Sequence, residues 1–304
     1  MNILTTIKKV SAILTLCISM TSLAQAATIS RPALEDFLKA QETTQKQEKI
    51  QYAVKATLFS PLGIGNFVMN GNILKDPVNK KTNQQEAHAD GHGHAELALL
   101  TGNRFQSPDY SYYAAAENNL LVQYVKTGST WKKALTPVSL SVQPKEKHDY
   151  KTLRKRVLEA QVTADSPTER TIRLTLDAKE IFKAQEKKDG KIPARKSRED
   201  KEWDAVLEQI KELTYLATID KQSNRLTSVS LDLTPILRTT GLSALTAADS
   251  QWKLTPQQRQ MAEALISTST LGITVNLDYD PKKEPKFPEG AKKAKEVKLS
   301  ELFK

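Results

Sequence analysis

Three short strands are predicted from one stretch of the sequence, YSYYAAAENNLLVQYVKTGSTWKKAL at residues 110–135. Tyrosine and valine, which favour strands, recur along it. Two short polar breaks interrupt the runs, Glu117-Asn118-Asn119 and Thr127-Gly128-Ser129, and their asparagine and glycine residues are typical of tight hairpin turns. The stretch therefore predicts a meander of three consecutive antiparallel strands.

Further strands are predicted on both sides of this meander by residues that alternate between apolar and polar. The clearest run is 271–279, where Leu271, Ile273 and Val275 alternate with Gly272 and Thr274. The other predicted strands lie at 51–58, 66–75, 95–100, 157–163, 171–176, 214–219 and 226–233.

Helices are predicted at 30–49, from 177, at 199–213 and from Pro256, where Thr255 and Gln258 have the form of a capping box. Together these elements predict an α+β fold with about ten antiparallel strands in sequential hairpins and helices on one face of the sheet. We expect one domain over residues 27–281.

The first 26 residues have the composition of a cleavable signal peptide. Lys8 and Lys9 precede an apolar run at 10–23, which ends in Ala24-Gln25-Ala26. The run is shorter than the roughly 18 apolar residues of a membrane-spanning helix, and it contains serine and threonine. We therefore expect residues 1–26 to be removed and the protein to be periplasmic or secreted.

The single cysteine excludes several kinds of chemistry. Cys17 lies within the predicted signal peptide and follows Leu16, whereas a lipoprotein-processing site has a small residue there, so we expect no lipid anchor. The mature chain then has no cysteine. Disulfides, thiol catalysis and cysteine-metal sites are therefore excluded.

The chain is basic, with a formal net charge of +10 that falls to +8 when the signal peptide takes Lys8 and Lys9 with it. This excess either serves solubility or favours contact with an anionic membrane surface. We expect no nucleic-acid partner and a monomer. Residues 282–304 form a basic C-terminal tail, which we expect to be weakly ordered apart from 297–303.

In this layout the chain resembles the LolA/LppX-like superfamily of bacterial envelope lipid and lipoprotein carriers, including secreted relatives of LppX and LprG. The resemblance departs at 77–95 and 183–201. It implies a strongly curved antiparallel sheet that forms an unclosed (half) β-barrel, with helices covering the concave face. It rests on a helix leading into 50–58, the meander at 110–135, the strand pair 215–220 and 226–233, and the strand 272–280 followed by Pro285-Lys286-Phe287-Pro288.

A curved sheet of this kind leaves an apolar hollow between its concave face and its helices. Acyl chains fit such a space, since each buried methylene contributes about 0.8 kcal/mol. Each apolar strand residue then either packs in the hydrophobic core or lines the wall of the ligand cavity. The candidates for the wall are Val54, Leu58, Phe67, Met69, Leu97, Leu99, Leu121, Val125, Leu174, Leu176, Val229, Leu231, Leu233, Ile273, Val275 and Leu277.

One segment contains residue types that bind metals. His88, His92 and His94 lie close together among glycines, alanines and acids. In a flexible segment these imidazoles can converge on zinc, copper or nickel, and a solvated polar loop is the alternative interpretation. No helical His-Glu-x-x-His arrangement, nucleophile elbow or phosphate-binding loop is present, so we expect no catalytic residue and no cofactor beyond a weakly bound divalent metal.

Two functions fit these observations. The first is an exported, non-enzymatic carrier or binding protein for a hydrophobic ligand in the cell envelope, such as a lipid, a glycolipid or an acylated peptide. The second is an envelope protein that binds a divalent metal through the segment 88–94.

Overall fold

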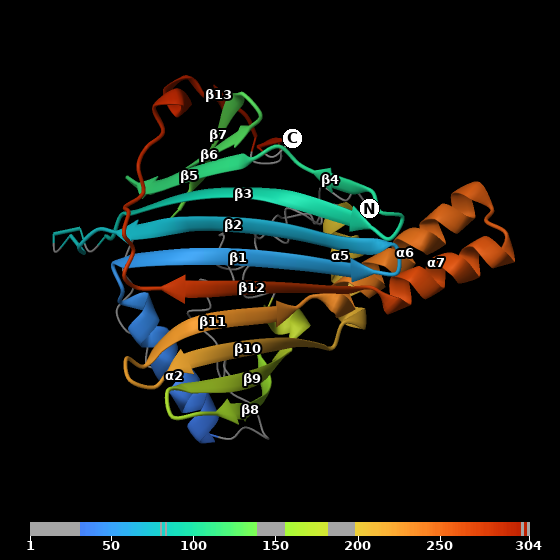
Figure 1. Ribbon diagram of the computed structural model, residues 1–304, viewed down its shortest axis with the longest axis horizontal. Coiled ribbons are helices and arrows are strands. Elements are labelled where there is room, and N and C mark those ends of the chain that lie inside the picture. Colours follow the sequence, from blue (N-terminus) through green and yellow to red (C-terminus); the bar gives the residue numbers. More distant parts are fainter. Residues whose placement is uncertain are drawn as a thin grey trace.

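A single unclosed β-sheet organises the molecule (Figure 1). The computed structural model describes residues 31–79, 81–82, 84–138, 156–181, 198–298 and 301–302. Within them the sheet has 13 strands in the order β13-β7-β6-β5-β3-β2-β1-β12-β11-β10-β9-β8, with β4 paired to β3 alone. Only β13 and β7 pair in parallel among these strands. The predicted signal peptide at 1–26 lies outside the described residues.

The strands are β1 (Lys49–Ser60), β2 (Gly63–Lys75), β3 (Ala87–Leu99), β4 (Arg104–Gln106), β5 (Tyr110–Glu117), β6 (Leu120–Thr127), β7 (Thr130–Pro137), β8 (Val157–Asp165), β9 (Glu169–Asp177), β10 (Glu212–Asp220), β11 (Arg225–Asp232), β12 (Thr270–Asp278) and β13 (Lys295–Glu296). The helices are α2 (Arg31–Gln45), α5 (Arg198–Gln209), α6 (Thr234–Trp252), α7 (Pro256–Thr268) and the 3-10 helix η1 (Glu289–Lys293). Over the described part of the chain, no helix is both long and apolar enough to cross a membrane.

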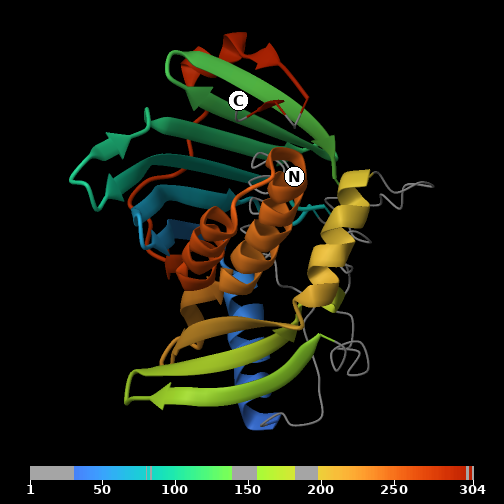
Figure 2. The same cartoon turned by 90° about the vertical axis from the view of Figure 1, so that its right-hand side faces the viewer.

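Figure 2 shows the sheet curving round α2 and α5, which lie on its concave side, while α6 and α7 project past the end of the strands (Figure 1). The helix α2 packs across β8, β10 and β11, and α6 packs against β12 and α5. The predicted α+β fold with a curved, unclosed antiparallel sheet is therefore confirmed.

The meander predicted at 110–135 is confirmed as β5, β6 and β7. At its first turn Asn118 and Asn119 have φ angles of 51° and 60°, in the left-handed region that asparagine tolerates. Gly128, with a φ of 62°, has the same role at the second turn. The capping box is also confirmed, because Thr255 Oγ1 accepts from the Gln258 amide while the Gln258 side chain accepts from the Thr255 amide.

Two elements differ from the sequence prediction. The strand β3 begins at Ala87 instead of 95, because 87–94 alternates small residues with polar ones and lacks the large apolar residues that mark a strand. The helix α6 is not among the predicted helices, since its apolar residues are not gathered along one face. It is anchored near its start, where Ile236 and Thr240 are buried.

The main hydrophobic core fills the concave face of β1 and of β8–β12, beneath α2, α5 and α6. Phe37 of α2 and Tyr215 of β10 are fully buried in it and meet edge to face, with ring centroids 5.9 Å apart. As far as the structure describes the chain, this core includes no residue of β3, β5, β6 or β7. The sheet therefore has a packed half and a half that this core does not reach.

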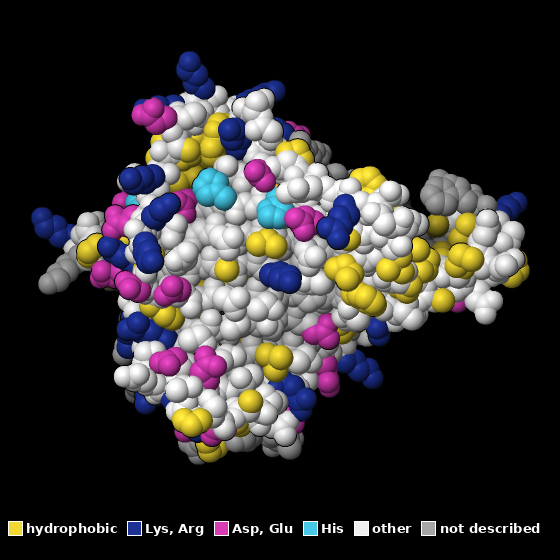
Figure 3. Space-filling model, viewed as in Figure 1, with side chains coloured by type: hydrophobic (Ala, Val, Ile, Leu, Met, Phe, Trp, Pro, Cys, Tyr) yellow, Lys and Arg dark blue, Asp and Glu magenta, His cyan; other side chains and the backbone are white. Residues whose placement is uncertain are grey.

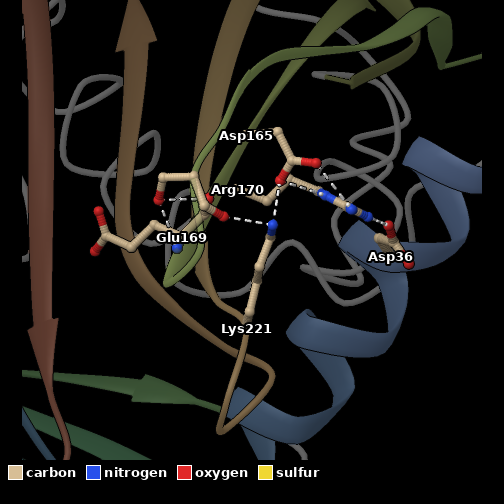
Figure 4. A network of polar contacts seen from close by, with 6 residues as sticks. Asp36, Asp165, Glu169, Arg170 and Lys221 are labelled. Carbon is tan, nitrogen blue, oxygen red and sulfur yellow. Dashed lines mark hydrogen bonds and ion pairs between the residues drawn. The ribbon is translucent and has the colours of Figure 1, made fainter.

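A network of ion pairs fixes α2 to the packed half (Figure 4). Arg170 of β9 pairs with Asp36 of α2, and its Nη2 lies 3.2 Å from Asp165 Oδ2 of β8. Lys221, in the β10–β11 turn, places Nζ 2.5 Å from Asp165 Oδ1. Hydrogen bonds from Arg170 and Lys221 hold the pKa of Asp165 below its usual value. The network joins the helix to two neighbouring hairpins.

The C-terminal tail crosses the convex face at Phe287 and wraps round the β7 edge to the concave face at Leu302, which corrects the expectation of weak order. The Phe287 ring meets Tyr113 and Tyr124, with centroids 5.3 Å from each. The strand β13 then pairs with β7, and Leu302 is fully buried against Val125. The tail thereby covers the β7 edge of the sheet, which would otherwise present unpaired backbone groups.

Candidate functional site

The strand register decides which side chains face the concave side. Val54 of β1 lies opposite Val275 of β12, and both belong to the main core, so this row faces the helices. In the other direction Val54 lies opposite Met69, which lies opposite Gly93. Because side chains alternate along a strand, the concave side is occupied by even-numbered residues in β1 and odd-numbered residues in β2 and β3.

From this row towards the β1–β2 turn, the concave face of β1, β2 and β3 contains only apolar or small residues. The next rows are Ala56, Phe67 and Ala95, and then Leu58, Gly65 and Leu97. We call this surface the concave floor. It consists of Ala56, Leu58, Gly65, Phe67, Met69, Gly93, Ala95 and Leu97.

The concave floor is more exposed than the core beside it. Leu58 and Leu97 are 36% and 40% exposed, and Phe67, Met69 and Ala95 are half-buried, whereas Val54 is 1% exposed. Glycine inside a strand weakens the strand, and it often marks a place where a ligand or another backbone approaches closely. The floor is therefore an accessible apolar surface with two strand glycines in it.

Two tyrosines and two glycines form one row at the inner end of the floor. Tyr52, Gly71, Gly91 and Tyr112 lie opposite one another across β1, β2, β3 and β5. The phenol of Tyr52 covers both glycines, since a Cβ added at Gly71 or Gly91 would lie 2.6 or 2.7 Å from Tyr52 Oη. The glycines are thus required for the tyrosine to lie flat across the sheet.

Both phenols are hydrogen-bonded and neutral. Tyr52 Oη donates to the Asp90 carbonyl at 2.7 Å, and Gln123 Nε2 donates to Tyr112 Oη at 3.2 Å. Burial raises the pKa of Tyr52 and of Tyr112, so neither phenol ionises near neutral pH. The row places polar groups at the inner end of an otherwise apolar surface.

The structure divides the wall residues predicted from the sequence into two groups, all on the concave face or at its border with the helices. The residues of the first group are at most 3% exposed and belong to the hydrophobic core: Val54, Val125, Leu174, Leu176, Val229, Leu231, Leu233, Ile273 and Val275. The more exposed group keeps its candidate role: Leu58, Phe67, Met69, Leu97, Leu99, Leu121 and Leu277. Sequence reasoning missed Ala56, Gly65, Gly93 and Ala95. The available signal was the alternation of Gly93 and Ala95 with polar residues.

The histidine segment belongs to β3, which corrects the expectation of a loop. His88, His92 and His94 alternate with the small residues of the floor, so they lie on the convex face. A strand rises about 3.4 Å per residue, so His88 and His94 stand roughly 20 Å apart. The convergence that the metal hypothesis requires does not occur in this strand.

Each histidine has a local partner instead. His88 lies 3.5 Å from both Asp76 and Glu117, and His94 lies 3.2 Å from Glu96. His92 shares a 3.2 Å hydrogen bond with Ser111 of β5. Within the described ranges, no group of three or more His, Cys, Asp or Glu side chains is arranged to hold a metal ion.

Comparison with known proteins gives similarity at the level of layout. No family model and no curated protein matches this chain. Among solved structures, LprF from Mycobacterium bovis is 13% identical with a TM-score of 0.37, covering 86% of this chain and 99% of its own. A DUF1329 family protein from Desulfovibrio piger is 8% identical with a TM-score of 0.22, covering 83% of this chain and 95% of its own.

A domain described as an outer membrane lipoprotein-sorting protein from Vibrio parahaemolyticus is 8% identical, with a TM-score of 0.26, and covers 83% of this chain and 94% of its own. Because each TM-score is below 0.5, the functional inference below depends on the geometry of this chain alone.

Proposed function

We propose that this protein is an exported, non-enzymatic carrier that binds a hydrophobic chain on the concave floor. The observation that supports this most strongly is the contrast in exposure along the concave face, from its middle to the end at the β1–β2 turn. Val54 and Val275 are sealed beneath helices, while Leu58 and Leu97 on the same face remain more than a third exposed. Apolar surface that a protein leaves accessible in a concave place is typical of a ligand site.

The dimensions of the floor suit an acyl chain. From Gly65 to the tyrosine row at Gly71, β2 rises about 20 Å at about 3.4 Å per residue. One leaflet of a bilayer is about 15 Å of hydrocarbon, half of a core of about 30 Å, so a chain that fills a leaflet fits along the floor. Each methylene that it buries contributes about 0.8 kcal/mol.

The small side chains also argue for an adaptable ligand. Gly65, Gly93 and Ala95 protrude little from the sheet. Met69 beside them has a flexible, polarisable side chain that adjusts to ligands of different shapes. A lipid, a glycolipid or an acylated peptide would meet this surface through its apolar chain. The chemistry of recognition is burial, and no bond-making step is required.

The test is to fill the floor with a side chain. We expect Ala95→Phe to weaken the binding of a fluorescent fatty-acyl probe, added from solution, by about tenfold or more, because the added ring occupies volume that the ligand needs. The matched control is Ala53→Phe, which places the same ring on the convex face of β1, opposite Asn70 and Asn276. Circular dichroism checks that both variants fold.

Equal loss of affinity in the two variants, or no probe binding by the unmodified protein, would refute a ligand site on the floor. Native mass spectrometry of freshly purified protein provides a second readout. We expect a bound lipid mass that is present in the Ala53→Phe variant and reduced in the Ala95→Phe variant.

A further inference from the structure

One end of the sheet carries large apolar side chains in contact with solvent. They surround the β1–β2 and β3–β4 turns, where Leu62 is 59% exposed and Leu100 is 78% exposed. Single exposed leucines are ordinary, but a contiguous group marks an interaction surface. We call this group the tip patch: Leu58, Phe59, Leu62, Ile64, Leu97, Leu100 and Phe105.

Backbone pairing shows that the tip patch is continuous. Phe59 lies opposite Ile64 across β1 and β2, and Leu97 lies opposite Phe105 across β3 and β4. The Leu100 amide donates to the Leu62 carbonyl at 3.0 Å, which ties the two turns together. The patch therefore occupies both faces and the end of the sheet.

The neighbouring helices extend this surface. Figure 3 shows hydrophobic side chains gathered at the end of the sheet nearest α6 and α7, and continuing along those helices. Leu242 of α6 is 40% exposed and Met261 of α7 is 61% exposed, and the described part of α7 has no buried residue. The two helices pack on each other where Gly241 meets Ile266, so their outer sides stay available to a partner.

We propose that the tip patch docks this protein on the surface of an anionic lipid membrane. The proposal rests on the proposed function, because Leu58 and Leu97 belong both to the tip patch and to the concave floor. An acyl chain that leaves a bilayer at this end reaches Phe67 and Ala95 without crossing a polar side chain. This continuity favours a lipid surface over a protein partner as the occupant.

Charge at the same end agrees with lipid headgroups. Arg104 of β4 is exposed and lies beside Phe105 of the patch. Lys55 is also exposed, but it lies in the middle of β1, about 14 Å from Phe59 at about 3.4 Å per residue. The nearest carboxylate on β3, Glu96, is ion-paired with His94 at 3.2 Å. An exposed cation beside apolar turns contacts anionic headgroups while the turns enter the interface.

The experiment is flotation of the purified protein with vesicles of phosphatidylcholine and phosphatidylglycerol in equal parts. We expect the double variant Leu62→Glu/Leu100→Glu to lower the vesicle partition coefficient by at least about tenfold, since two apolar turn residues no longer enter the bilayer. The matched control is Val78→Glu/Leu120→Glu, whose parent residues are 39% and 38% exposed at the opposite end of the sheet. This control should float like the unmodified protein.

Several results would overturn the proposal. The first is that the unmodified protein does not float with the vesicles. The second is that both double variants lose the same amount of vesicle binding. The third is that the unmodified protein binds vesicles of phosphatidylcholine alone as well as the mixed vesicles, which would remove the role of anionic headgroups. An unmodified protein that ignores vesicles but loses self-association when Leu62 and Leu100 are replaced would identify the patch as a protein interface instead.

The fatty-acyl probe, added from solution, separates this inference from the proposed function. If the tip variant loses vesicle binding but keeps probe affinity, both proposals stand. If the unmodified protein floats through the tip patch but takes up no probe, the docking surface stands and the carrier function fails.

Discussion

Gly71 and Gly65 lie on the same strand and the same face, yet the space around them differs. A Cβ at Gly71 would lie 1.9 Å from the Asp90 carbonyl oxygen and 2.6 Å from Tyr52 Oη, so β2 and β3 would have to separate. At Gly65 the nearest atom would be Leu58 Cβ at 3.7 Å, an ordinary contact. A Cβ at Gly71 would clash with the neighbouring backbone, whereas a Cβ at Gly65 would make only ordinary contacts.

This difference predicts the stability of two alanine variants. We expect Gly71→Ala to lower the free energy of unfolding by about 2–3 kcal/mol or more, because a neighbouring strand must move. Gly65→Ala should stay within about 1 kcal/mol of the unmodified protein. Urea denaturation of both variants measures the difference, and equal destabilisation would show that Gly71 is not sterically constrained.

At the scale of elements, Asp165 joins the β8–β9 hairpin to Lys221 and contacts Arg170, which pairs with Asp36 of α2. Hydrogen bonds from Arg170 and Lys221 lower the pKa of Asp165 in the folded state. Such a group contributes stability that is fully present above the unfolded-state pKa, near 3.8, and that is lost as the pH falls through the lower folded-state value. The contribution is modest, since the carboxyl group is solvent-exposed.

We therefore expect Asp165→Asn to be less stable than the unmodified protein at pH 7, with the gap closing below about pH 4. The urea midpoint of both proteins, measured at several pH values, gives this gap. Asp109→Asn, which changes an exposed carboxylate in the segment before β5, is the matched control. A gap that is constant with pH would mean that the Asp165 carboxylate does not stabilise the fold through its charge.

The elements were predictable from sequence where large apolar side chains mark them. The meander of β5, β6 and β7 and the final strand β12 alternate in this way, and the turn residues Asn118 and Gly128 delimit them. The first half of β3 could not be found by the same criterion, because its concave side consists of alanine and glycine. Backbone pairing with β2 and β5 keeps this part of β3 in the strand conformation.

The order of the tail was not predictable either. Its parallel pairing with β7 and the contacts of Phe287 join residues far apart in the sequence, and no local pattern indicates such contacts. For the candidate site, the alternation along the strands predicted which face Val54, Phe67 and Met69 share. It could not predict which of them the helices seal, because that depends on where α2 and α6 lie.

At the scale of the whole molecule, the two halves of the sheet have different roles. The strands β8–β12 and the helices α2, α5 and α6 form a core that accounts for the stability of the fold. The strands β2 and β3 carry an accessible apolar floor, which is bordered by the Tyr52 row at one end and by the tip patch at the other. The central claim is that this floor holds the apolar chain of the ligand.

Photo-crosslinking tests this claim most directly, with a fatty acid that carries a diazirine near the end of its chain, followed by peptide mapping by mass spectrometry. We expect crosslinks on floor residues such as Phe67, Met69 and Leu97, and we expect excess unlabelled fatty acid to suppress them. Crosslinks confined to the convex face, or crosslinks that excess fatty acid does not suppress, would contradict this claim.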